Sequence, residues 1–175
     1  MQFQPLTITL LTLGLAVVGC RKQPPTTATA ASAAQPALTA WQQGDRAGAV
    51  STFLTADWTA GPLFAPDSML SLTEAEFSGQ MRPLRMPGFM TTGGIEARRV
   101  QMTKELATMK QLAAAVAQAG RDAAATNDVA SARKHFTSLQ RFAAILDTTN
   151  SLAILRLDAQ AIKRKADAEL ATLPP

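Results

Sequence analysis

Few residues in this 175-residue chain have the types and spacing that chemistry requires. Ser131-Ala-Arg-Lys134 matches the S-x-x-K pattern of a serine nucleophile, but the S-D-N and K-T-G motifs that accompany it are missing from the sequence. His135 is the only histidine, whereas metal sites take several ligands. Glu74 and Glu76 lie two residues apart on an expected helix, so their carboxylates point away from one another. We therefore expect no catalytic residues, no metal and no cofactor.

The single cysteine, Cys20, stands at the end of an apolar run that carries no charge. The run extends from Leu6 to Val18, and a helix of that length rises only about 20 Å, less than the ~30 Å hydrocarbon core of a membrane. The length is typical of the apolar region of a signal peptide, and the small Gly19 precedes the cysteine, as a processing site requires. With one cysteine, no disulfide can form within the chain.

Val17-Val18-Gly19-Cys20 resembles the lipobox of bacterial lipoproteins. The resemblance implies cleavage before Cys20, so that residues 1–19 are a signal peptide, and lipidation of the new N-terminal cysteine with a diacylglycerol and an acyl chain such as palmitate. Two or more chains make a stable membrane anchor. The resemblance also implies a bacterial cell envelope and, because the following residue is not aspartate, an outer membrane facing the periplasm in a cell that has one.

The N-terminal segment departs from that pattern in its charge. Residues 1–5 lack the Lys or Arg of a basic n-region, and Arg21-Lys22 follow the apolar run instead. An uncleaved apolar anchor with a chance cysteine, or a misplaced start codon, would also produce this arrangement.

Residues 20–36 are expected to form a tether, because they are rich in Pro, Ala and Thr and hold little that could be buried. A flexible stretch of this length spans about 20–25 Å. The net charge of +4 is modest and spread along the chain, so we expect no nucleic-acid partner. Tyrosine is absent and aromatic residues make up 5% of the chain, which favours packed helices over a β-sandwich.

The remaining residues, 37–175, are expected to form a single all-α domain of antiparallel helical hairpins. Short helices are predicted over 37–81, with Gly44 ending one helix, Asp45 capping the next, and S/T-x-x-E capping boxes at Ser71 and Thr73. Pro and Gly predict a loop over 82–94. Apolar stripes at helical spacing predict three longer helices over 95–172, with polar breaks and N-caps at residues 126–128 and 147–151.

Two stretches share a spacing of turn, small residue and aromatic residue. Gly44-Asp45 is followed by Ala49 and Phe53, and Asn127-Asp128 is followed by Ala132 and Phe136. This spacing resembles the second half of a tetratricopeptide (TPR) repeat, which implies stacked helical hairpins. The copies lie 83 residues apart, unlike the ~34 of tandem repeats, so generic helical hairpins are the alternative interpretation.

The sequence predicts a lipid-anchored envelope protein whose domain binds or scaffolds an envelope protein partner. The candidate contact residues are Met86, Phe89 and Met90 in the 82–94 loop, because flexible thioethers suit adaptable surfaces. The alternative is an envelope enzyme whose acidic residues converge only in three dimensions. A deep pocket lined by two or more carboxylates would favour the enzyme, and an apolar groove between helices would favour the binding domain.

Overall fold

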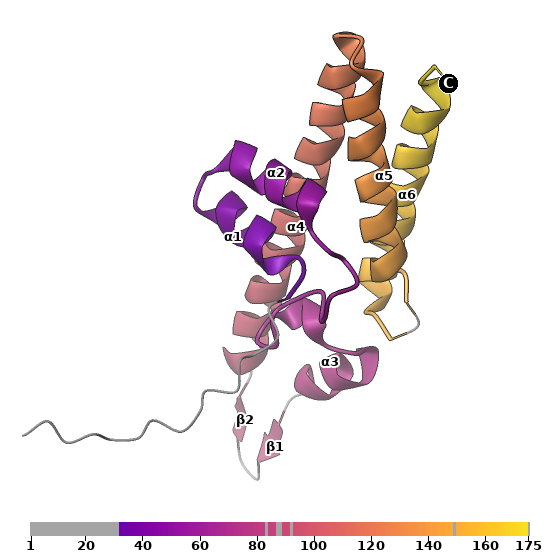
Figure 1. The fold of residues 1–175 in the computed structure, drawn as a ribbon. Coiled ribbons are helices and arrows are strands. Elements are labelled where there is room, and N and C mark those ends of the chain that lie inside the picture. The colour runs from indigo at the N-terminus through magenta and orange to yellow at the C-terminus, as the bar shows by residue number, and fades with distance from the viewer. Residues whose placement is uncertain (1–31, 83, 87–88, 92, 149, 175) are drawn as a thin grey trace, which may run out of the picture.

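A computed structural model describes residues 32–82, 84–86, 89–91, 93–148 and 150–174 (Figure 1). Cys20, the apolar run and most of the expected tether lie outside these residues. The elements in chain order are α1 (Gln35–Gln42), α2 (Arg46–Thr55), the 3-10 helix η1 (Met69–Ser71), α3 (Glu74–Gln80), β1 (Leu84–Met86), β2 (Phe89–Thr91), α4 (Gly93–Ala125), α5 (Val129–Leu146) and α6 (Ala153–Thr172). The described part is mostly helical, which confirms the all-α class.

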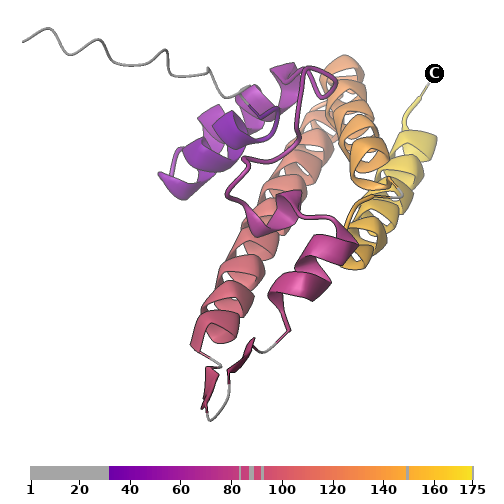
Figure 2. The same ribbon diagram turned by 90° about the horizontal axis from the view of Figure 1, so that it is seen from below.

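The three longer helices lie side by side, as their apolar stripes predict. α5 packs along both α4 and α6, and short turns make each neighbouring pair antiparallel (Figure 1). The hairpin of α1 and α2 lies against α4 and α5 on the side away from α6, an order that Figure 2 shows from below. Phe53 of α2, Trp58 and Phe142 of α5 form an aromatic cluster at this contact, with ring centroids 4.6–5.1 Å apart.

The two polar turns confirm their predicted capping roles. Gly44 adopts a positive φ of 88° where α1 ends, and the Asp45 side chain accepts a hydrogen bond from the Gly48 N–H at the start of α2. Asn127 adopts a φ of 63°, and Asp128 accepts a hydrogen bond from the Ser131 N–H at the start of α5. Local side-chain chemistry therefore determines both turns.

The small and aromatic positions that follow these turns are equally buried in both copies. Ala49 and Ala132 are fully buried, and Phe53 and Phe136 are each 1% exposed. Gly120 lets α4 approach α5, since a methyl group on this residue would lie 2.8 Å from Phe136 Cζ. The geometry agrees with paired helices in both places, and the TPR resemblance itself stays a prediction.

The start of the domain differs from the expected boundary at residue 37. The Ala33 and Ala34 N–H groups donate to the carbonyls of Pro62 and Leu63, each at 3.0 Å, and Ala34 is buried. α1 then begins at Gln35, with Pro36 in its first turn, where a missing N–H costs nothing. Residues 32–36 therefore belong to the folded domain and not to the tether.

The start of α6 also differs from the prediction. The expected caps within residues 147–151 are not used, and Leu152 stands at the N-cap without a side-chain hydrogen bond. Instead, Glu74 of α3 accepts a hydrogen bond from the Ala153 N–H at 2.9 Å. A carboxylate far away in the sequence thus satisfies an N–H group that the local polar residues leave free.

Of the two expected capping boxes, the one at Thr73 is confirmed: its hydroxyl accepts from the Glu76 N–H while the Glu76 carboxylate accepts from the Thr73 N–H. The one at Ser71 does not form, because Ser71 lies in η1 and its hydroxyl donates to the Ser68 carbonyl. The expected 82–94 loop is instead largely a short antiparallel hairpin, in which Leu84 pairs with Thr91 and Met86 with Phe89. α4 then begins at Gly93, two residues before the predicted start. The Pro and Gly content of the sequence favoured a loop and obscured this pairing.

Candidate binding groove

A groove of about 780 Å³ runs between α4 and α6. Because both helices are antiparallel to α5, they run parallel to each other, and they touch one another little. Phe136 and Leu139 of α5 line the bottom of the groove and are 1% and 2% exposed. The groove is therefore the space between α4 and α6, which both pack against α5 but hardly touch each other.

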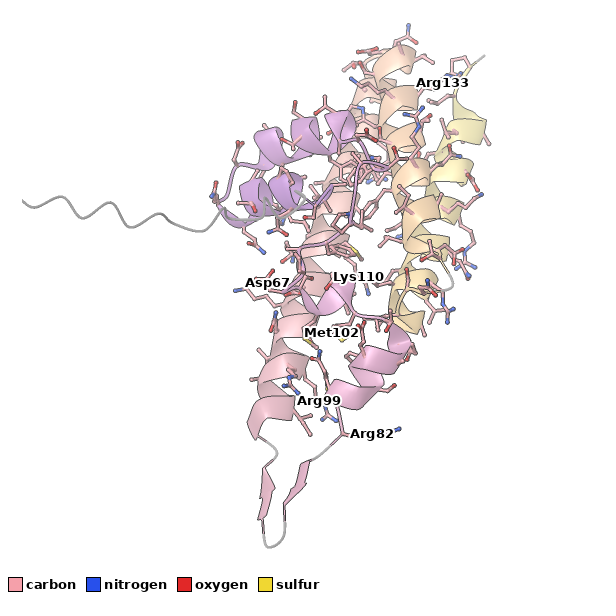
Figure 3. The ribbon with its side chains drawn as sticks, turned by 60° about the horizontal axis from the view of Figure 1, so that its bottom comes forward. Asp67, Arg82, Arg99, Met102, Lys110 and Arg133 are labelled. Atoms are coloured by element: carbon pink, nitrogen blue, oxygen red, sulfur yellow. The ribbon has the colours of Figure 1, made fainter. Side chains whose placement is uncertain are left out.

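Two ion pairs cross the groove in register. Lys110 of α4 meets Asp158 of α6 at 3.0 Å, and Arg121 of α4 meets Glu169 of α6 at 3.2 Å. Eleven residues separate the two basic residues, and eleven separate the two acidic ones. Eleven residues are three helical turns, so the pairs lie on one face of each helix and about 16 Å apart. Lys110, in the middle of α4, is labelled in Figure 3.

The walls between the ion pairs consist mostly of alanine. Ile162 is the one larger apolar side chain in these walls. The alanines are Ala113, Ala114 and Ala117 of α4, and Ala161, Ala166 and Ala168 of α6. Methyl groups this short cannot meet across the space between two helices that are held apart by α5. The small side chains therefore explain why the groove stays open.

The rim carries one more basic residue than acidic residues. Lys165 lines the groove on α6, is exposed, and forms no ion pair with a described residue. Lys165 and Glu169 are four residues apart on α6, a spacing that favours an ion pair, but Glu169 pairs with Arg121. Lys163 and Asp167 have the same spacing and do form an ion pair, at 2.8 Å. Hydrogen bonds from Lys163 and Gln140 lower the pKa of Asp167.

A second, smaller hollow of about 210 Å³ contains two carboxylates, Asp67 and Glu105. Glu105 Oε2 accepts hydrogen bonds from the Ser68 hydroxyl at 2.8 Å and from the Met69 N–H at 2.9 Å. Its other oxygen accepts from Gln101. Glu105 therefore holds η1 against α4, and its oxygens are occupied by structural contacts.

The other residues that the sequence offered for catalysis or metal binding make local hydrogen bonds within α5. His135 Nδ1 lies 2.6 Å from the carbonyl oxygen of Ser131, one turn earlier in α5. The Ser131 N–H is bonded to Asp128. Within the described residues, no three His, Cys, Asp or Glu side chains gather in a way that could hold a metal ion.

The sequence-predicted site residues are not brought to the groove. Cys20 lies outside the described residues. Met86 and Phe89 are paired across the hairpin, and Met90 is paired with Arg85, at the end of the molecule beyond α4 (Figure 1). Sequence reasoning missed the groove, although a signal existed: alanines flanked by Lys110 and Arg121 on α4, and by Asp158 and Glu169 on α6, at the same eleven-residue spacing.

Comparisons with known protein families, with curated proteins and with solved structures found no match for this chain. Among the helices of the described ranges, none combines the length and the apolar composition that a membrane span needs.

Proposed function

We propose that this chain is a lipid-anchored protein of the bacterial cell envelope whose helical domain is a binding domain. The observation that carries the binding role is the apolar groove between α4 and α6. An apolar groove between helices favours a binding domain, although two carboxylates also line this one. The two carboxylates at its rim, Asp158 and Glu169, are each held by a basic residue of α4.

The anchoring role is supported by the lipobox-like residues 17–20 and tested at the cysteine. Cells that make the wild-type chain or Cys20→Ser are fed an alkyne fatty acid, and the chain is then isolated and labelled. We expect label on the wild type only, together with accumulation of the unprocessed precursor of Cys20→Ser. Equal labelling of both chains contradicts the anchor.

The binding role is tested with a photoreactive amino acid placed at Ala114, an exposed alanine that lines the groove. Ala144 on α5 is a matched control, because it is an exposed helical alanine that does not line the groove. We expect crosslinks in the native envelope from position 114 and few from position 144. The same yield from both positions excludes the groove as a specific site.

The hairpin of β1 and β2 is a second candidate contact surface, because it projects from the end of the molecule (Figure 1). Met86, Phe89 and Met90 belong to its strands. If this surface binds the partner, Phe89→Ala combined with Met90→Ala reduces crosslinking to the partner and changes the melting temperature little. Destabilisation by about 3 kcal/mol or more would place these residues in a packed interior instead.

A further inference from the structure

We propose that the groove binds one long-chain fatty carboxylate. The alkyl chain lies between α4 and α6, and the carboxylate lies at the end that holds Arg121 and Lys165. This inference rests on the proposal that the groove is the binding surface, and it names the chemical class of the ligand.

The dimensions of the groove fit such a molecule. Its volume of about 780 Å³ falls within the range of about 300–1,000 Å³ that is typical of small-ligand sites. An extended covalent chain advances about 1.2 Å per bond, since a residue of three backbone bonds spans at most about 3.6 Å. The ~16 Å between the ion pairs therefore accommodates an extended alkyl chain of about 14 carbons.

The charges of the groove give the ligand a direction. At one end, Arg121 and Lys165 face a single acidic residue, Glu169, so that end carries one net positive charge. At the other end, the formal charges of Lys110 and Asp158 cancel, although Asp158 Oδ2 is buried and has no hydrogen-bond partner among the described residues. A head group with a single negative charge complements the first end, and the second end has no net positive charge that would compete for it.

The lining favours an alkyl chain over the helix of a protein partner. Helical partners are held mainly by large side chains that enter pockets, often opposite aromatic residues. The aromatic residue at the bottom of this groove, Phe136, is already 1% exposed and offers almost no surface. A narrow alkyl chain instead needs only a continuous apolar lining of alanine methyl groups, which α4 and α6 supply.

The test uses the full-length chain in phosphatidylcholine vesicles and fatty carboxylates that carry a photoreactive diazirine at the tip of the chain. The 14-carbon probe is expected to label residues near Lys110 and Asp158. The 8-carbon probe, which reaches about half as far, is expected to label residues near Ala114 and Ile162. Mass spectrometry of the digested chain locates both labels, and the reverse order would overturn the proposed direction.

Two pairs of variants test the chain and the head separately. Ala117→Phe fills the groove and is expected to reduce labelling at least tenfold, whereas Ala144→Phe outside the groove leaves it unchanged. Lys165→Gln removes the unpaired charge and is expected to reduce labelling up to about fivefold, the range of one exposed ion pair. Lys163→Gln is its control, because Lys163 is paired with Asp167 and does not line the groove.

Two results would overturn the inference. One is equal labelling of Ala117→Phe and Ala144→Phe, provided that circular dichroism shows both variants folded. The other is labelling that is unaffected by Lys165→Gln and scattered along the chain. If position 114 crosslinks to an envelope protein but no fatty carboxylate labels the groove, the fatty-acid ligand is wrong and the proposed binding function stands.

Discussion

Gly120 is expected to be the most sensitive glycine of the helical core, and Gly120→Ala tests the packing of α4 on α5. An added Cβ would lie 2.8 Å from Phe136 Cζ and 3.1 Å from His135 Cβ, closer than ordinary van der Waals contact. Phe136 is 1% exposed and is surrounded by packed side chains, so it cannot swing away without disturbing them.

The size of the effect follows from two opposing contributions. Overpacking a well-filled core costs about 1–3 kcal/mol. Replacing glycine by alanine within a helix gains about 1 kcal/mol. The net expectation is a destabilisation of about 1 kcal/mol, which lowers the melting temperature by about 4 °C for a domain of this size.

Gly79 in α3 is the matched control. A Cβ at this position meets nothing within 4 Å, so Gly79→Ala keeps the gain in helix propensity without the overlap. Thermal melts followed by circular dichroism should therefore shift in opposite directions for the two variants. If Gly120→Ala raises the melting temperature as Gly79→Ala does, α4 and α5 do not pack as closely at Gly120 as the structure indicates.

A double-mutant cycle identifies Phe136 as the cause. Phe136→Leu removes the ring atoms that the new methyl group would meet, so Gly120→Ala should become neutral or stabilising in that background. A coupling energy of about 0.5–3 kcal/mol is typical of residues in contact. A coupling near zero would mean that the cost arises elsewhere.

Three further predictions concern the remaining packing and capping contacts. Phe53→Ala should destabilise the domain by about 3–5 kcal/mol in urea unfolding, because the ring is 1% exposed at the centre of the aromatic cluster; a cost below 1 kcal/mol would contradict the docking of α2. Asp45→Ala should cost about 1 kcal/mol and Asp45→Asn much less, because asparagine can still cap α2; equal costs would argue against the cap. Hydrogen bonds from the Ser131 hydroxyl and N–H lower the pKa of Asp128, so its contribution is present above the ordinary value of 3.8 and is lost as the pH falls through the lowered value. The protection factor of the Ser131 amide hydrogen should fall over that acidic window in the wild type, and a wild-type protection factor as independent of pH as that of Asp128→Asn would refute the role.

The features that could be predicted from the sequence are those that neighbouring residues determine. Gly44-Asp45 and Asn127-Asp128 were identified because a positive φ and an N-cap side chain act within a few residues of the chain. The pairing of Lys163 with Asp167 is a local feature of the same kind, since residues four apart share a helix face.

The features that could not be predicted depend on contacts between distant segments. Glu169 pairs with Arg121 and not with Lys165, because α5 holds α4 alongside α6 and places a guanidinium within reach. In the same way Glu74 caps α6, and residues 32–34 join the domain through the carbonyls of Pro62 and Leu63. No local pattern carries that information.

Small residues have opposite consequences on different faces of these helices. Gly120 faces α5, and because it has no side chain the two helices can approach closely at Phe136. Ala117, three residues earlier on the groove side of α4, faces no helix directly, so its small size leaves a hollow instead. Because α5 already sets the positions of α4 and α6, larger side chains at Ala117 or Ala161 would fill the groove without being needed to hold the fold. Packing therefore does not require a small side chain at these two positions, unlike at Ala113 and Ala166, which are 6% and 1% exposed and belong to the core. It is this freedom that makes the groove a candidate for function.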